Sequence, residues 1–384
     1  TSLINEAHSY GTEVSLVVIL FNSDNIAQLL SNPSNRQTLI NNLLAEVNDA
    51  GADGVNIDFE GVPSSQRDNL TTFMTDLTAA FHEANPASQV TMATPAVDWS
   101  NAFDYDALAN ACDGLMIMGY AYHWSGSSVA GPVSPLSGWG TYNITWTVND
   151  YLSKTGNDRD KIILGLPYYG YEWPTTSGSA GASTTGSGDA KFYSEAIALA
   201  ESYGPLWNDE SQSPWYRYQD GNNNWHQGWY DDSLSLSLKY ELAIDEDLLG
   251  IGIWALGYDG TEPELWGALE DHFGTGLSVN SEVALQPKTP TLKVIYPNPS
   301  NIHVNFVIQI PQGYQLATAY IKIFDVLGRS VAEIPLPATP TAGGELTVTW
   351  NGKTSAGNLG ATGTYTALLF ADGQICSQKF ILLK

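Results

Sequence analysis

The sequence of 384 residues predicts an α/β domain built on a parallel sheet, followed by a smaller all-β domain. In the first part, apolar runs of strand length alternate with helix-like segments, a pattern typical of a parallel sheet with helices outside it. The last hundred residues contain only short alternating runs, separated by Pro and Gly. Charge changes at the same place: residues 285–384 carry a net charge of +3, whereas the rest of the chain carries −29.

The predicted elements of the first part follow one another in a regular order. The strand-length runs are Glu13–Leu20, Gly54–Glu60, Val90–Val97, Gly114–Ala121, Lys161–Tyr169 and Gly250–Gly257. The helix-like segments between and before them include Thr1–Tyr10, Asn35–Ala50, Ser64–Glu83 and Ser194–Tyr203. A long segment, Tyr171 to Asp247, separates the last two runs. Within it, Thr175–Asp189 has the composition of a flexible loop, whereas residues 215–219 and 222–230 predict short strands joined by a turn.

The segment Asp53–Glu60, DGVNIDFE, carries the clearest functional signal. Apolar and polar residues alternate along it with the period of a β-strand, so Asn56, Asp58 and Glu60 share one face. Carboxylates on a buried strand cost several kcal/mol unless they are compensated, which indicates that the protein uses them. The alternative is a solvated edge strand with a polar outer face.

This segment resembles the active-site strand of family 18 glycoside hydrolases, the chitinase family, whose pattern is D-x-x-D-x-D-x-E. Asn56 departs from that pattern, since the family has Asp there. The resemblance implies a TIM (β/α)8-type barrel without its first two strands in this chain, with a small α+β insertion at about residues 171–247. A doubly wound sheet of six strands is the structural alternative.

The resemblance also implies the roles of the acidic residues. Glu60 is the expected general acid, and Asp58 is the partner that orients the substrate's acetamido group, which itself acts as the nucleophile. A neighbouring carboxylate raises the pKa of such an acid, so that it keeps its proton at neutral pH. Asp53 and Asn56 lie deeper on the strand and are the expected supporting residues. A turn or strand cap is the alternative for Asp53.

A second motif, Met118-Gly-Tyr-Ala121, resembles the M-x-Y-D of the family's sixth strand. It makes Tyr120 the expected donor to the acetamido oxygen and Met118 a substrate-binding residue. Ala121 replaces the family's Asp, a loss for which Tyr122 or His123 is a candidate substitute. A structural role is the alternative for His123.

Aromatic side chains supply the remaining candidates for substrate binding. Trp254 matches the family's tryptophan beneath the sugar, and a pyranose ring stacks well on such a large planar group. A core tryptophan is the alternative. Tyr168 and Trp124 are further candidate cleft residues.

Composition and missing motifs narrow the range of partners. A net charge of −26 argues against nucleic acid and anionic membranes and suits a neutral polysaccharide. We expect no membrane insertion, because no apolar run is long enough to span a bilayer. We also expect no cofactor and no metal, since no His pair has zinc spacing and no phosphate loop occurs. A monomer without a disulfide framework is expected, because Cys112 and Cys376 fall in different predicted domains.

The last part of the chain predicts a separate β-sandwich at residues 292–384, after a barrel domain at 1–278 and a linker at 279–291. Its strand-like runs are Val304–Ile310, Ala319–Phe324, Leu346–Trp350, Tyr365–Phe370 and Gln378–Leu383. The motifs Tyr296-Pro-Asn-Pro, Ile323–Arg329 and Gly363-Thr-Tyr resemble the C-terminal sorting domain of the type IX secretion system of Bacteroidetes. That resemblance implies a secretion machinery as partner and a secreted or cell-surface location. A carbohydrate-binding sandwich presenting Trp350, Tyr314 or Tyr320 is the alternative.

The sequence therefore predicts a secreted glycoside hydrolase of the endo-β-N-acetylglucosaminidase type. It would cleave β-1,4-linked N-acetylglucosamine polymers, chitin or chitooligosaccharides, by a substrate-assisted, retaining mechanism. One alternative is a non-catalytic, lectin-like barrel that binds chitin, which Asn56 and Ala121 favour and Asp58 and Glu60 oppose. The other is an N-acetylglucosaminidase acting on peptidoglycan or glycoprotein glycans.

Overall fold

The computed structural model describes residues 2–274, 291–296, 300, 303–310, 319–325, 329–336, 344–355, 357–371 and 374–383. The chain divides into two compact units, Thr1–Leu277 and Ser278–Lys384. Apart from its last residue, Thr291, the predicted linker at 279–291 lies outside the described residues. Within the described residues, no helix is both long and apolar enough to cross a membrane.

A six-stranded parallel sheet forms the frame of the first unit. Its strands are β1 (Ser15–Leu20), β2 (Gly54–Phe59), β3 (Gln89–Pro95), β4 (Gly114–Met118), β5 (Ile162–Pro167) and β11 (Gly250–Trp254). They follow one another in chain order, and every neighbouring pair is parallel. All six predicted strands are thus confirmed. A doubly wound sheet reverses its strand order at a switch point, and no such reversal occurs here, so that alternative is wrong.

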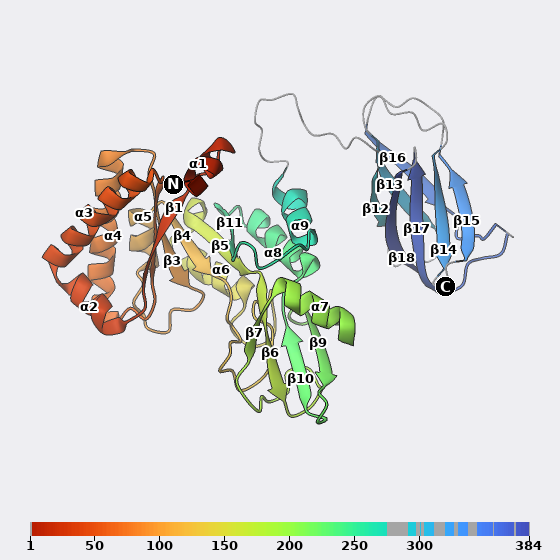
Figure 1. The fold of residues 1–384 in the computed structure, drawn as a ribbon, viewed down its shortest axis with the longest axis horizontal. Coiled ribbons are helices and arrows are strands. Elements are labelled where there is room, and N and C mark those ends of the chain that lie inside the picture. The colour runs from red at the N-terminus through yellow and green to blue at the C-terminus, as the bar shows by residue number, and fades with distance from the viewer. Residues whose placement is uncertain are drawn as a thin grey trace. The chain divides into compact units, whose positions relative to one another are not determined.

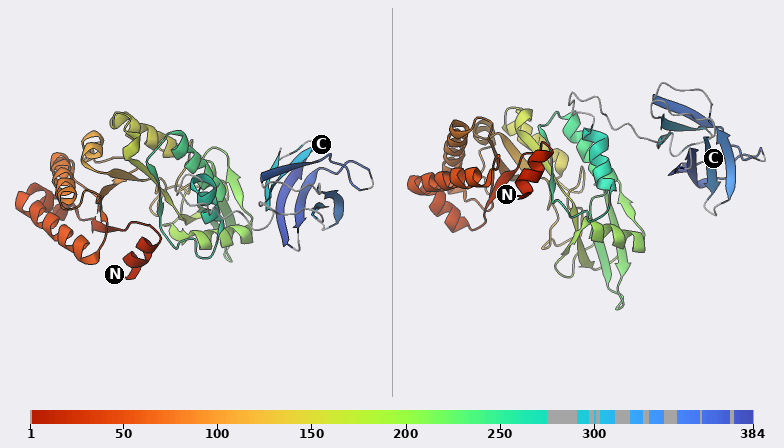
Figure 2. Two further views of the ribbon diagram at one scale, coloured as in Figure 1. Left: turned by 90° about the horizontal axis from the view of Figure 1, so that it is seen from above. Right: turned by 45° about the horizontal axis from the view of Figure 1, so that its top comes forward.

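Helices connect the parallel strands, because a parallel pair needs a long crossover. They are α2 (Ser23–Ser31), α3 (Pro33–Ala50), α4 (Arg67–Ala84), α5 (Tyr105–Ala111), α6 (Ile144–Lys154) and α8 (Ser233–Asp245), with short 3-10 turns at Ser64–Gln66 and Arg159–Lys161. Helix α1 (Ser2–Ser9) precedes β1, and α9 (Glu264–Phe273) follows β11. Side-chain caps define several starts: Asn32 accepts from the backbone of α3, and Asn143 does the same for α6. Helices α2 to α5 lie along one face of strands β1 to β4 (Figures 1 and 2).

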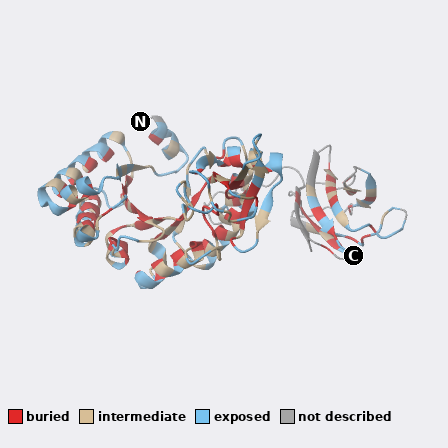
Figure 3. Cartoon of the chain, turned by 90° about the horizontal axis from the view of Figure 1, so that it is seen from below, coloured by how far each residue is buried: buried red, intermediate tan, exposed pale blue. Residues whose placement is uncertain are grey.

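The hydrophobic core lies between this sheet and its helices. In β2 the apolar residues Val55, Ile57 and Phe59 are almost fully buried, and the Phe59 ring stacks on Phe73 of α4 with centroids 5.9 Å apart. Buried residues follow the strands and the helix faces turned toward them (Figure 3). Because the apolar half of β2 packs under the helices, its polar half faces the opposite side of the sheet.

The sheet has two edges within residues 2–274, namely β1 and β11. On β1, Val17 and Ile19 are paired with Asn56 and Asp58 of β2, so they belong to the polar face of the sheet. Their exposed fractions are 58% and 63%, respectively. The face that carries the acidic residues therefore continues onto an exposed apolar edge.

An insertion lies between β5 and β11 in the chain. It is an antiparallel sheet ordered β7-β6-β10-β9-β8. Its elements are β6 (Tyr169–Thr175), β7 (Asp189–Phe192), α7 (Tyr193–Tyr203), β8 (Leu206–Asn208), β9 (Ser213–Gln219) and β10 (Trp225–Trp229). Strands β9 and β10 form the hairpin that the sequence predicts. Helix α8 falls inside the predicted bounds of the insertion, but it packs against α9 and β11 and so belongs to the parallel-sheet layer.

The second unit contains two antiparallel sheets. One is ordered β12-β13-β16 and the other β15-β14-β17-β18. Their bounds are β12 (Thr291–Tyr296), β13 (Val304–Ile310), β14 (Tyr320–Asp325), β15 (Ser330–Pro335), β16 (Gly344–Trp350), β17 (Gly363–Ala371) and β18 (Gln374–Leu382). One hydrophobic core draws on both sheets, as in a β-sandwich; for example, the rings of Phe306 and Phe380 lie 5.7 Å apart.

The carbohydrate-binding alternative for this unit loses its main candidate. Trp350 is buried in the core against Tyr365 and Phe380, and so it offers no surface on which a sugar could stack. The ring of Tyr320 stacks on Phe370. Tyr314 lies outside the described residues, as do parts of the sorting motifs, residues 297–299 and 326–328.

Candidate active site

The acidic residues of β2 lie on one face of the sheet, as their spacing predicts. Asp58 is buried at 8% exposure, whereas Glu60 follows the last residue of the strand and is exposed. One level deeper, the Asn56 side-chain amide donates to Thr91 Oγ1 of β3 at 2.8 Å. Glu60 therefore stands at the carboxyl end of a parallel strand, where barrel enzymes place their chemistry.

The surroundings favour the protonated forms of both carboxyl groups. Burial raises the pKa of Asp58, and its Oδ1 atom is buried without a hydrogen-bond partner among the described residues. The pKa of Glu60 is raised by partial burial and further by the negative charge of Asp58. Both shifts favour the protonated carboxyl over the ionised one, and Asp58 keeps a buried oxygen that no described residue contacts.

Tyr120 approaches the same carboxylates from β4. The chain leaves that strand through Gly119, whose N–H donates to the carbonyl oxygens of Ile117 and Gly165, each at 2.9 Å. A Cβ on Gly119 would lie 2.5 Å from the Gly165 oxygen, so only glycine fits this approach. The pKa of Tyr120 is raised by burial and by the charges of Asp58 and Glu60. Its hydroxyl therefore stays protonated and can donate a hydrogen bond beside the two carboxyl groups.

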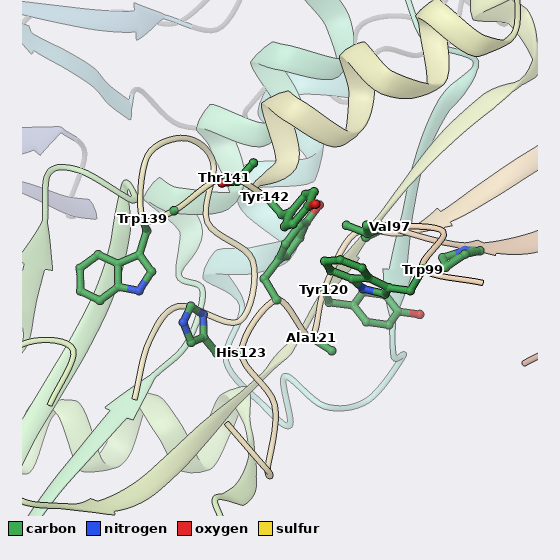
Figure 4. A pocket seen from close by; sticks show the side chains of 12 residues that line it. Val97, Trp99, Tyr120, Ala121, His123, Trp139, Thr141 and Tyr142 are labelled. Carbon is green, nitrogen blue, oxygen red and sulfur yellow. The ribbon is translucent and has the colours of Figure 1, made fainter. Parts of the chain in front are cut away.

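Two adjoining pockets open at this end of the sheet. The carboxylate pocket, about 230 Å³, is lined by Glu60 and Met118 together with residues that follow β2 and β3. The aromatic pocket, about 360 Å³, is lined by Trp99, Tyr120, Tyr122, His123, Trp139 and Tyr142 among others (Figure 4). Pro95, Val97 and Trp99 line both, so the two pockets are neighbours, and together they are called the cleft.

The predicted binding residues Met118, Trp254 and Tyr122 fall at three different places. Met118 lines the carboxylate pocket. Trp254 ends β11 opposite Pro167 and is 46% exposed, but it lies outside both pockets. Tyr122 lines the aromatic pocket, while its hydroxyl is engaged with Thr147 Oγ1 at 2.6 Å.

Three other candidates lie away from the cleft. Asp53 sits at the opposite end of β2, where its carboxylate accepts from the Val14 N–H at 2.6 Å and lies 2.8 Å from His8 Nε2. The Val14 hydrogen bond, with His8, lowers its pKa, so Asp53 is a strand cap rather than a supporting residue. Tyr168 is a core residue, 1% exposed, with its hydroxyl 3.4 Å from that of Tyr240. Trp124 is exposed on a loop outside both pockets.

Several cleft residues were not predicted. Trp99 lies four residues after the end of β3, so the rule that barrel chemistry lies beyond strand ends could have found it. Tyr169 lines neither pocket, but its ring lies 6.0 Å from that of Tyr120, whereas the sequence predicts its neighbour Tyr168 as the cleft residue. Trp139 and Tyr142 belong to the loop between β4 and α6, which has no periodicity to interpret. No group of three or more potential metal ligands occurs within the described ranges.

The loop between β4 and α6, residues 119–143, is joined to the insertion by backbone hydrogen bonds. The N–H groups of Ala130 and Leu136 donate to the carbonyls of Ala182 and Ser211, respectively, each at 3.0 Å. In the opposite direction, the Gly188 N–H donates to the Ser125 carbonyl at 2.8 Å. The aromatic pocket is therefore bordered by a loop that rests on the insertion.

Comparison with known proteins extends these findings. Residues 20–259 match the profile of glycosyl hydrolases family 18. Di-N-acetylchitobiase of Rattus norvegicus is 30% identical over 307 residues, which cover 70% of this chain and 79% of that protein. The cortical fragment-lytic enzyme of Bacillus subtilis (strain 168) is 27% identical, over 65% of this chain and 57% of its own length.

A further relative, YdhD of Bacillus subtilis (strain 168), is 31% identical over 64% of this chain. The match spans only 56% of YdhD, little more than half of its length. The crystal structure of YdhD superposes with a TM-score of 0.59, over 66% of this chain and 84% of the crystallised one, at 28% identity.

Proposed function

The chain belongs to glycosyl hydrolases family 18, a chitinase-like family of α/β TIM-barrel hydrolases, and from this we propose that it cleaves β-1,4-linked N-acetylglucosamine polymers. The observation that carries the proposal is the pairing of Glu60, whose pKa is raised by burial and by Asp58, with the buried and unpartnered Oδ1 of Asp58 on the same face of the sheet. An acid and a free buried acceptor side by side are what a substrate-assisted reaction needs.

Each side chain has one task in the proposed first step. Glu60 donates its proton to the glycosidic oxygen as the bond to the anomeric carbon breaks. The carbonyl oxygen of the substrate's acetamido group attacks that carbon and forms a cyclic intermediate. Asp58 Oδ1 accepts the acetamido N–H, and the Tyr120 hydroxyl donates to the acetamido oxygen, so both hold the group in its reactive position.

In the second step Glu60, now ionised, accepts a proton from water. The water oxygen bonds to the anomeric carbon, the bond to the acetamido oxygen breaks, and the original configuration returns. The test is turnover of chitotetraose, with the anomer of the new reducing end followed by NMR. Initial release of the β-anomer is expected; initial release of the α-anomer would contradict a retaining mechanism.

Peptidoglycan is a second candidate substrate, favoured by the similarity to the cortical fragment-lytic enzyme. The chemistry at Asp58 and Glu60 would be the same, and only the sugars in the adjoining pockets would differ. Comparing kcat/KM on chitotetraose with kcat/KM on soluble peptidoglycan fragments decides between the two.

For the second unit we propose a role in export to the cell surface or the medium. The support is its resemblance to type IX sorting domains and a hydrophobic core that shares no residue with that of the first unit. In a Bacteroidetes host, the full chain should be found outside the cell, whereas a chain ending before Ser278 should remain inside.

A further inference from the structure

The aromatic pocket contains a histidine whose tautomer is set by its neighbours. His123 Nδ1 lies 2.9 Å from the Pro132 carbonyl oxygen, which can only accept, so Nδ1 carries the proton. Burial lowers the pKa of His123 and keeps the ring neutral. Its other nitrogen, Nε2, is therefore a hydrogen-bond acceptor, and among the described residues it has no hydrogen-bond partner.

A hydrogen-bond donor lies next to this acceptor. Trp139 Nε1 and His123 Nε2 are each 2.7 Å from the point that a Cβ on Gly131 would occupy. Within the part of the chain that the structure describes, the indole N–H also has no partner. Both side chains lie on the same side of the pocket (Figure 4). The two nitrogens are therefore no more than twice 2.7 Å apart, which is short enough for one oxygen atom to lie within hydrogen-bond distance of both.

Trp139 is held in place by an unusual backbone and by the insertion. Gly138, Trp139 and Gly140 have φ angles of 54°, 50° and 101°, of which the value for Trp139 is uncommon for a residue with a side chain. The backbone N–H of Trp139 donates to Glu210 Oε1 at 3.1 Å. The centroid of the Trp139 ring lies 4.8 Å from that of Trp229. Backbone strain of this kind persists where the surroundings fix it, and it is concentrated at functional sites.

The pairing of donor and acceptor selects the chemistry of the ligand. A hydroxyl can accept from an indole N–H and donate to an imidazole nitrogen through the same oxygen. A trans amide points its N–H and C=O in opposite directions, and a carboxylate only accepts, which would leave Nε2 facing a second acceptor. We propose that His123 and Trp139 bind one hydroxyl of a sugar unit next to the cleavage site, and so favour a neutral saccharide over one carrying a carboxylate there. This inference rests on the proposed function.

The experiment removes each polar atom while keeping a ring in its place. Trp139→Phe retains the packing on Trp229, and His123→Phe retains a ring of similar size. Both are made in the wild-type chain, to measure KM and kcat on chitotetraose, and in the Glu60→Gln chain, to measure Kd for the same sugar by calorimetry. Each is expected to raise KM and Kd about 3- to 10-fold, the loss of one hydrogen bond, with kcat changed less than about twofold. Trp207→Phe in β8, outside the pocket, is the matched control and should change neither constant.

Two further variants test whether both nitrogens bind the same hydroxyl: the double variant His123→Phe/Trp139→Phe, and Gly131→Ala. If one hydroxyl bridges both nitrogens, the double variant should weaken binding by less than the product of the two single effects. Gly131→Ala places a methyl group against both nitrogens, so it should raise KM at least as much as either substitution. Unchanged KM and Kd in the three single variants, with unchanged melting temperatures, would overturn the inference and show that the pair holds only water. If Glu60→Gln abolishes turnover while those constants stay unchanged, the proposed function stands and this site alone fails. Absence of turnover and binding in the wild-type chain would overturn both.

Discussion

The charge of Asp58, two residues before Glu60 on the same side of the sheet, adds to the rise in the Glu60 pKa that partial burial causes. A second ionisable carboxyl group, that of Asp58, therefore lies next to the proposed proton donor. It predicts how activity and stability respond when either carboxyl group is replaced.

Glu60→Gln should lower kcat on chitotetraose by at least about a hundredfold, because only the proton donor is lost. Glu60 is exposed, so the melting temperature should not change. Glu241→Gln, an exposed residue of α8, is the matched control and should retain full activity. A Glu60→Gln enzyme that keeps more than about a tenth of the rate would rule out the assignment.

Asp58→Asn should move the basic limb of the pH–rate profile to lower pH, besides lowering the rate. Activity requires protonated Glu60 and so falls as pH rises through the Glu60 pKa. The charge of Asp58 raises that pKa, and its removal lowers it. Measuring kcat/KM from pH 4 to pH 9 tests this, and a basic limb that stays in place would show that the carboxyl groups are not coupled.

The same substitution should stabilise the fold at neutral pH. The pKa of Asp58 is raised in the folded state, so ionisation of its buried, unpartnered carboxyl group lowers the free energy of unfolding. The wild-type chain should lose stability relative to Asp58→Asn as pH rises above about 4, the ordinary Asp pKa, and through the raised folded value. Below that window both forms are neutral and the difference should vanish. Urea unfolding at pH 3.5 and pH 7 measures it, and equal differences at the two pH values would contradict the prediction.

Ala121→Asp should raise the rate on N-acetylated substrates without loss of stability. Ala121 lines the aromatic pocket next to Tyr120, is exposed, and has a φ of 59°, which Asp and Asn tolerate better than most residues. A charged acceptor here would not be buried, and a charge-assisted contact to the substrate is worth about 1.5–3 kcal/mol. Ala121→Asn, of the same shape but neutral, is the control. A slower or less stable Asp variant would indicate that Tyr122 or His123 already fills this place.

A chain ending before Ser278 should keep the kcat/KM of the full chain on chitotetraose. The two hydrophobic cores share no residue, so the first unit should also melt at an unchanged temperature. Pull-down on insoluble chitin completes the measurement: weaker binding by the shortened chain, with export intact, would make the second unit a binding domain instead.

The period-two pattern of the sequence predicts the six strands and the shared face of Asp58 and Glu60 because strand geometry is local. The same rule could have prevented two errors. With a period of two, Asp53 falls on the face of Val55 rather than on that of Asn56. In the same way Tyr168 falls on the face of the buried Leu166, so neither residue could face the cleft. Trp139 was beyond such reasoning, since it reaches the pocket through three successive positive φ angles.

Because the loop at residues 119–143 donates to and accepts from the insertion, and Trp139 leans on both Glu210 and Trp229, the cleft border is a joint property of two chain segments. The insertion therefore cannot be exchanged independently of the loop at residues 119–143. A chimera that takes the insertion from a relative would need the loop from the same relative. Otherwise the hydrogen bonds and the ring contact between the two segments would be lost.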